Sequence, residues 1–178
     1  MEITRVFDLL RQQLTEFPQS DMLAAKEGDN WRTYSTQEVQ DLVNKLSLGL
    51  MKMGVKKDDK VAMVSPNRPE WVITDYAIQQ LGAISVPMYP TITEQDYRYI
   101  LTDADVKFVF LADTGLLEKV EAAAKGIASI QGIYTYDKIP GAKHWSEVTA
   151  LGEKEYPKLL EPFRSWMNRS TPTIAPFA

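Results

Sequence analysis

The segment "KVAMVSPNRPEW", residues 60–71, decides the fold because an apolar run gives way to a polar loop and then to a helical pattern. Residues 60–65 have the length and apolar character of a buried strand. Asn67 and Glu70 have the spacing of a capping box, and Pro69 is tolerated in a first helical turn, where its missing N–H goes unused. The segment therefore predicts a strand, a polar loop and a helix.

The same order of strand, loop and helix repeats downstream. Further strands are expected at residues 83–89, 107–112 and 130–136, and helices at 68–81, 94–103 and 115–125. Apolar strands that alternate with helices through short connections are typical of a parallel sheet covered by helices on both faces. We therefore predict an α/β fold of Rossmann-like βαβ units with right-handed crossovers.

An N-terminal region precedes this alternation. Residues 3–17 have apolar side chains at helical spacing, and residues 22–34 have the pattern of a β-hairpin. Ser35 and Glu38 have capping-box spacing and indicate the start of a second helix. A helix and a hairpin are therefore expected before the sheet.

Composition divides the chain into four parts. Residues 1–57 hold the N-terminal helix, the hairpin and the capped helix, and residues 58–140 form a βαβ parallel-sheet subdomain. Residues 141–164 are predicted to be a weakly helical connection with one helix near 146–151. Residues 165–178 are rich in proline and small polar residues, and we expect an irregular tail there, either truncated or altered by a changed reading frame.

Composition also excludes several classes of protein. The 178 residues carry a net charge of −4, which argues against nucleic acid as the main partner. The chain has no cysteine and one histidine, His144, so thiol catalysis and thiolate or multi-histidine metal sites are excluded. The N-terminus lacks the pattern of a signal peptide, and no apolar run is long enough to span a membrane. We expect a cytoplasmic protein.

The loop at residues 65–71 has two interpretations. A helix start that follows a strand can bind phosphate through its free N–H groups. This loop has no glycine, however, Pro66 and Pro69 remove two donors, and the carboxylate of Glu70 would repel an anion. Helix capping, with Trp71 as a packing residue, is the better interpretation. For Asp103, Asp105 and His144 a turn or packing role is likewise favoured over acid–base chemistry, so no catalytic residue and no metal ligand is predicted.

The segment "VPMYPTITEQDYRYIL", residues 86–101, carries polar side chains where a strand ends. Open parallel sheets bind ligands at this edge, which makes Tyr89, Thr91 and Thr93 candidates for a ligand rim. Thr93 and Asp96 also fit an ordinary helix start. Both interpretations stay open on the residues alone.

Residues 31–111 together resemble the N-terminal region of the adenylate-forming acyl-CoA synthetases, closest to the long-chain fatty acid–CoA ligases. The similarity rests on the Trp/Tyr-Ser lead-in to the first helix, on "SPNRPEW", on "GAISVPMYPT" and on "YRYIL", in that order. The Tyr-Pro-Thr strand exit is typical of the long-chain branch. Asp58 departs from the family pattern, which has glycine there, and should cost a turn preference.

The resemblance implies a reaction in two steps that uses ATP, Mg²⁺ and CoA. A fatty carboxylate attacks the α-phosphate of ATP to give acyl-adenylate and pyrophosphate, and the CoA thiol then displaces AMP. The family's phosphate loop, which ends in Pro-Lys-Gly, is absent from this sequence. We therefore expect part of the large N-terminal domain, without catalytic residues and without tight cofactor binding. The resemblance also places Tyr89, Thr91 and Thr93 at the CoA rim of the intact enzyme.

Two alternatives remain. The chain could belong to an adenylating enzyme for a shorter or an aryl acid, because acyl specificity depends on pocket residues found elsewhere in such enzymes. It could also be a non-enzymatic binding module that self-associates through an exposed sheet edge. Without a transmembrane segment, peripheral contact with a membrane stays possible.

Overall fold

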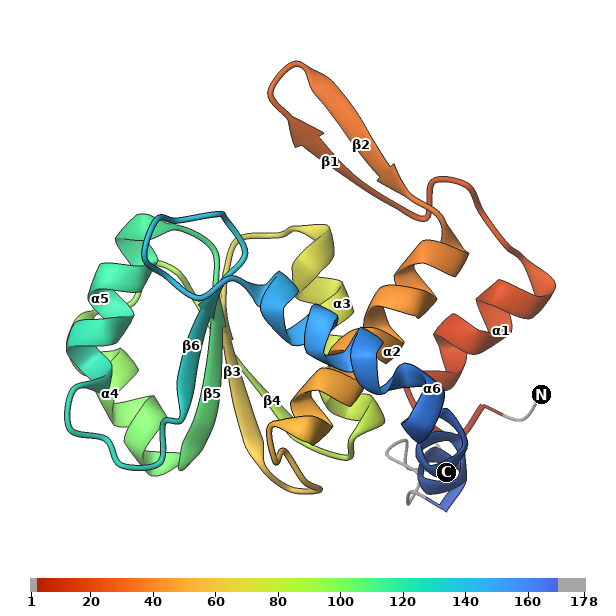
Figure 1. Cartoon of the computed structure of the whole chain (residues 1–178). Helices are drawn as coiled ribbons and strands as arrows, with labels where there is room; N and C mark the ends of the chain where they lie inside the picture. The colour runs from red at the N-terminus through yellow and green to blue at the C-terminus, as the bar shows by residue number, and fades with distance from the viewer. Residues whose placement is uncertain (1–2, 170–178) are drawn as a thin grey trace, which may run out of the picture.

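The computed structural model describes residues 3–169, and its centre is a four-stranded parallel sheet. The strands are β3 (Lys60–Val64), β4 (Ile84–Met88), β5 (Val106–Leu111) and β6 (Gly132–Thr135), and their spatial order is β4-β3-β5-β6. Each neighbouring pair is parallel, as in Val61 against Ser85 and Phe108 against Gly132. The predicted sheet is confirmed (Figure 1).

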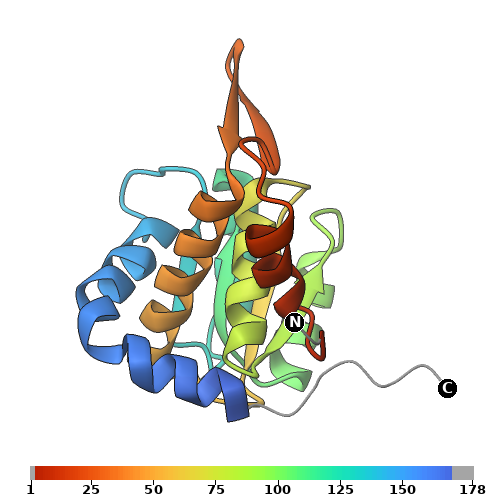
Figure 2. The ribbon, with the colours of Figure 1, turned by 90° about the vertical axis from the view of Figure 1, so that its right-hand side faces the viewer.

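Helices cover both faces of this sheet. One face carries α1 (Asp8–Glu16), α2 (Thr36–Lys52), α3 (Pro69–Gln80) and α6 (Trp145–Arg169), which lie side by side in Figure 2. The other face carries α4 (Glu94–Asp103) and α5 (Thr114–Ala124). Each face of the sheet has its own hydrophobic core, and alternate residues of the inner strands pack into one or the other. Met63 and Phe110 lie in the core of the first face, and Val64 and Val109 in that of the second. This alternation explains why the strands are apolar throughout.

The connections reverse direction between β3 and β5. The chain leaves β3 through α3 on one face toward β4, and it leaves β5 through α5 on the other face toward β6. Open α/β sheets bind ligands outside the carboxyl ends of the strands at such a reversal. The loops that follow β3 and β5 are therefore the natural place to look for a site.

The hairpin of β1 (Leu23–Glu27) and β2 (Asn30–Tyr34) projects from this body (Figure 1). Glu27 pairs with Asn30 across a two-residue turn, and Gly28 has a φ of 60°. A positive φ at the first turn residue without one at the second, Asp29, is the pattern of a type II′ turn, which matches the twist of a hairpin. Trp31 near the tip is 69% exposed.

Two capping predictions need correction. Asn67 does not cap α3, because the N-cap is Arg68 and no side chain bonds there. Pro69 forces the preceding residue into an extended conformation, which moves the helix start one position along the chain. At α2 only half of the box forms: the Ser35 hydroxyl accepts from the Glu38 N–H, but the Glu38 carboxylate pairs with Arg32 of β2.

Helix α6 is the largest difference from expectation. It runs over Trp145–Arg169, well beyond the predicted 146–151, and residues 165–169 of the expected tail are helical. Pro157 and Pro162 concealed this helix in the sequence, because proline usually ends or bends a helix. Figure 2 shows that α6 changes direction along its length. The rest of the predicted tail, residues 170–178, lies outside the described residues.

Helices α2 and α6 meet at backbone contact. A Cβ atom added at Gly152 would lie 1.8 Å from the Lys45 carbonyl oxygen, and one added at Gly49 would lie 2.0 Å from the Val148 carbonyl oxygen. Neither carbonyl can move without displacing its helix. The two glycines are therefore required for this packing.

Candidate functional site at the carboxyl edge of the sheet

Two hollows flank the loop that joins β3 to α3. The larger, of about 870 Å³, lies between the hairpin and the loops after β3 and β6, and its lining includes Trp31, Arg68 and Trp145. The smaller, of about 540 Å³, lies between the exits of β3 and β4, and its lining includes Trp71 and Tyr89. Pro66 and Asn67 line both hollows, so the loop after β3 is the wall between them.

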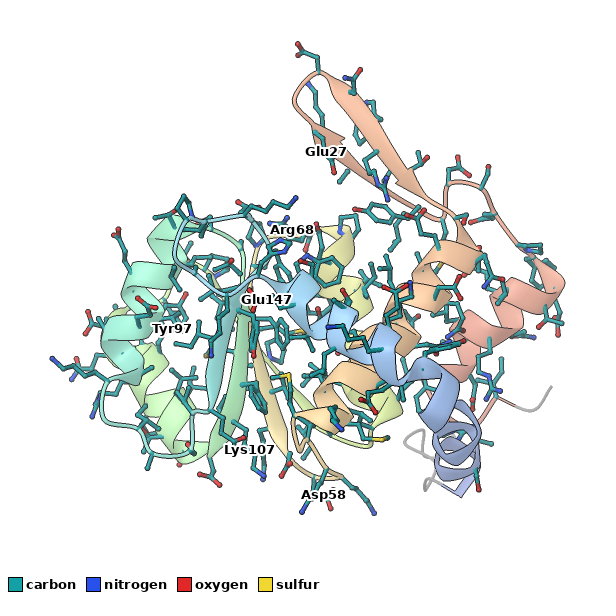
Figure 3. The ribbon with its side chains drawn as sticks, viewed as in Figure 1. Glu27, Asp58, Arg68, Tyr97, Lys107 and Glu147 are labelled. Carbon is teal, nitrogen blue, oxygen red and sulfur yellow. The ribbon has the colours of Figure 1, made fainter. Side chains whose placement is uncertain are left out.

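Arg68 is the centre of that wall. Its Nε and Nη2 atoms donate to the Glu70 carboxylate at 2.8 and 3.1 Å, and its Nη1 donates to Asp137 at 2.9 Å. Its guanidinium also lies 5.2 Å from the centre of the Tyr136 ring. Asp137 follows β6, and β5 separates β6 from β3, so Arg68 ties together the exits of two strands that do not touch. Figure 3 shows Arg68 at the sheet end nearer the hairpin, with Asp58 at the opposite end.

The electrostatics of this cluster favour a permanent ion pair. Burial alone would lower the pKa of the Arg68 guanidinium, but the hydrogen bonds and charges of Glu70 and Asp137 outweigh it and raise that pKa. All three guanidinium nitrogens are engaged and two carboxylates surround the cation. No positive charge is left over for a phosphate, which agrees with the packing interpretation of the loop.

Tyr136 connects the Arg68 cluster to α3 through hydrogen bonds. Its phenol donates to Thr74 Oγ1 at 3.0 Å, and that hydroxyl donates to the Glu70 carbonyl oxygen at 2.7 Å. Burial raises the pKa of the Tyr136 phenol, so it stays protonated as a donor. His144 Nε2 lies 2.8 Å from the Tyr136 carbonyl oxygen, which can only accept. His144 also has its ring edge-on to Trp145, with 6.4 Å between the ring centres, so the surface or packing role expected for it stays a prediction that these contacts fit.

The three predicted rim residues lie in one loop after β4. Tyr89 is 79% exposed and lines the smaller hollow, and Thr91 is exposed. The Thr93 hydroxyl accepts from the Asp96 N–H at 3.1 Å, and the Thr93 N–H donates to the Asp96 carboxylate at 3.0 Å, which completes a capping box for α4. The same hydroxyl also donates to that carboxylate at 2.6 Å. The expected helix start is confirmed, and the Thr93 hydroxyl is occupied by it.

The remaining candidates have structural roles. Asp103 ends α4, and Asp105 has a φ of 52° in the turn before β5. Within residues 3–169 no group of three or more acidic or histidine side chains could hold a metal ion. The Arg68–Asp137 pair was missed by the sequence analysis, because the two residues are 69 positions apart and nothing local relates them.

The comparison with protein families decides the family. The model for AMP-binding enzymes matches residues 10–172. This chain belongs to that family. Among similar proteins are long chain acyl-CoA synthetase 3 of Arabidopsis thaliana, 26% identical over 92% of this chain, and long chain acyl-CoA synthetase 1 of the same plant, 32% identical over 72% of it. The long-chain-fatty-acid–CoA ligase FadD15 of Mycobacterium tuberculosis is 28% identical over 74% of the chain.

These relatives are much longer than the chain, which covers 27%, 21% and 20% of their respective lengths. The chain therefore spans about a quarter of the curated relatives that it matches.

Solved structures show the same fold. The anthranilate CoA ligase AuaEII, solved with anthranoyl-AMP, superposes with a TM-score of 0.69 over 82% of this chain and 27% of its own, at 20% identity. The benzoate CoA ligase of Burkholderia xenovorans gives a TM-score of 0.66 over 80% of this chain and 27% of its own, at 18% identity. At these identities the likeness supports the fold alone. No helix in the described part of the chain combines the length and apolarity needed to cross a membrane.

Proposed function

We propose that this chain is the N-terminal part of an AMP-forming long-chain fatty acid–CoA ligase and that catalysis requires further segments. The main support is the family match over residues 10–172, together with long-chain relatives that the chain covers only in part. The parent enzyme would convert a fatty acid, ATP and CoA into acyl-CoA, AMP and pyrophosphate through an acyl-adenylate, with Mg²⁺ on the phosphates.

The chain itself has little of the chemistry that this reaction needs. Phosphoryl and adenylyl transfer depend on positioned cations and backbone donors around the phosphates. The sequence has no Pro-Lys-Gly loop. Arg68, in the loop after β3, is neutralised by Glu70 and Asp137. We therefore propose a folding and binding role for these residues within the parent, and no turnover by the chain alone.

The test compares two proteins in a pyrophosphate-release assay with ATP, Mg²⁺, palmitate and CoA. The 178-residue chain should give no turnover above a blank. The same chain extended by its downstream coding region should release pyrophosphate, if that region encodes the Ser/Thr/Gly-rich loop that ends in Pro-Lys-Gly. Sustained turnover by the 178 residues alone would overturn the proposal.

We further propose that Tyr89, Thr91 and Thr93 border the CoA site of the parent enzyme. The support is their place at the carboxyl edge of the sheet and the exposed Tyr89 ring beside a hollow that also contains Trp71. Flat aromatic faces suit a nucleotide base. Tyr89 and Thr91 would contact CoA, whereas Thr93 would hold the loop, because its hydroxyl caps α4. Thr91→Ala in the extended protein should raise the KM for CoA, and an unchanged KM would remove Thr91 from the site.

A second candidate function is self-association. In the described residues β4 pairs only with β3, so its outer edge carries no strand, and Ile84 on it is 45% exposed. Free strand edges favour pairing between copies, although Pro87 in β4 removes one donor. Light scattering decides: a monomer at high concentration contradicts this candidate, and a stable dimer supports it.

A further inference from the structure

The loop after β4, residues 89–93, is held by side chains from both helices that cover its face of the sheet. Tyr97 of α4 is fully buried, and its phenol donates to the Tyr89 carbonyl oxygen at 2.8 Å. Lys119 of α5 donates from Nζ to the Ile92 carbonyl oxygen. The Thr93 N–H donates to the Asp96 carboxylate at 3.0 Å. Three side chains thus each bond to one main-chain group of a five-residue surface loop.

Such bonding is more than helix capping requires. The Thr93–Asp96 box already satisfies the start of α4. The bonds from Tyr97 and Lys119 add nothing to that helix end, since they reach the carbonyl oxygens of Tyr89 and Ile92 on its N-terminal side. Surface loops are ordinarily mobile, and a loop held at its first residue and at its last two is pre-organised instead.

The two anchors also support each other. The Lys119 ammonium lies 5.4 Å from the centre of the Tyr97 ring, within cation–π range. Burial, followed by the nearby charge of Asp113, raises the pKa of the Tyr97 phenol, so it remains protonated and able to donate. Tyr97 therefore has one partner for its hydroxyl and one for its ring, and both lead to the same loop.

We propose that Tyr97 and Lys119 are positioning residues: they hold residues 89–93 in the conformation that places Tyr89 on the smaller hollow and leaves Thr91 exposed in the same loop. The effect of these residues on CoA binding rests on the proposed CoA rim. Their effect on the conformation of the loop rests on the contacts alone. The test therefore has one arm for each claim.

The first arm measures amide hydrogen exchange in the 178-residue chain. Loss of a hydrogen bond of about 1.4 kcal/mol corresponds to a tenfold change in an opening equilibrium. Tyr97→Phe and Lys119→Met should each speed exchange at Ile92 and Thr93 by about tenfold. Tyr99→Phe is the matched control, because Tyr99 lies in the same helix, is 69% exposed and should change nothing. Unchanged exchange in both anchor variants would overturn the proposal.

The second arm measures steady-state kinetics in the extended protein. Tyr97→Phe and Lys119→Met should raise the KM for CoA severalfold with kcat retained, and Lys119→Arg should recover part of the loss because it keeps a cationic donor. Tyr89→Ala separates the two claims. If it raises the KM for CoA while the anchor variants do not, the positioning role is wrong. If it leaves the KM unchanged, the CoA rim is wrong, and the exchange arm alone decides whether the anchors position the loop.

Discussion

At the scale of single residues, Arg68 shows how one side chain can define a corner of the fold. It joins the exits of β3 and β6 by hydrogen bonds to Glu70 and Asp137. Removing the cation would leave two carboxylates facing each other across a partly buried site. The cost of an unpaired charge exceeds the gain from the pair itself.

Arg68→Met should therefore lower the free energy of unfolding by about 2 kcal/mol, measured by urea denaturation. Arg68→Lys should lose about half as much, since it keeps the charge but not the planar fork. Arg11→Met is the matched control: Arg11 forms no ion pair among the side chains that the structure describes, and the change should stay within about 0.5 kcal/mol. Equal stability of Arg68→Met and the parent chain would show that the cluster does not hold the corner.

Asp58 is a second position where one residue measurably affects stability, here through backbone strain. Its φ is 67°, a conformation that favours glycine, and its side chain is exposed. Asp58→Gly should raise the free energy of unfolding by about 0.5 to 1 kcal/mol, because relief of strain exceeds the extra entropy of the unfolded chain. Lys57→Gly, one residue earlier and without a positive φ, should be destabilising. A lower melting temperature for Asp58→Gly would contradict the interpretation.

At the scale of elements, the contact between α2 and α6 makes the sharpest prediction. Gly152→Ala should destabilise the chain by more than about 3 kcal/mol, because its methyl group would overlap the main chain of α2. Gly115→Ala in α5 is the matched control, since the nearest atom to its added Cβ lies at an ordinary 3.5 Å. That change should be neutral or stabilising by up to about 1 kcal/mol. Thermal unfolding followed by circular dichroism compares the two, and similar effects would argue against the close helix contact.

The elements also show what sequence patterns can and cannot predict. The strands of the sheet were predictable because they are apolar runs bounded by turn residues, and α4 because Thr93 and Asp96 form a local cap. Helix α6 was underestimated because its prolines suggest a break, while its stability comes from packing on a helix about 100 positions away.

In the candidate site, too, local features were predictable from the sequence and contacts between distant segments were not. The exposed Tyr89 and Thr91 were predictable from their place at a strand exit, a local feature. The side chains that shape the site were not. The hydrogen bonds from Arg68 to Asp137 and from Lys119 to the Ile92 carbonyl oxygen form only when the sheet brings distant segments together. Contacts of this kind leave no pattern in a single sequence.

At the scale of the whole molecule, the parallel sheet places the loops of the candidate site together at its carboxyl edge. The neighbouring structures include CoA ligases named for anthranilate and for benzoate, whereas the similar sequences are named for long-chain acids. Fold alone does not choose between these substrates. The choice between a long-chain and an aryl acid therefore requires a direct measurement.

The most direct measurement is pyrophosphate release by the extended protein with ATP, Mg²⁺ and CoA against a panel of acids. We expect palmitate to give a kcat/KM at least about tenfold above that of benzoate or acetate, equivalent to about 1.4 kcal/mol of selectivity, a modest demand for a pocket that binds many methylenes. Higher kcat/KM with benzoate or acetate, or release that does not depend on the acid, would contradict assignment to a long-chain fatty acid–CoA ligase.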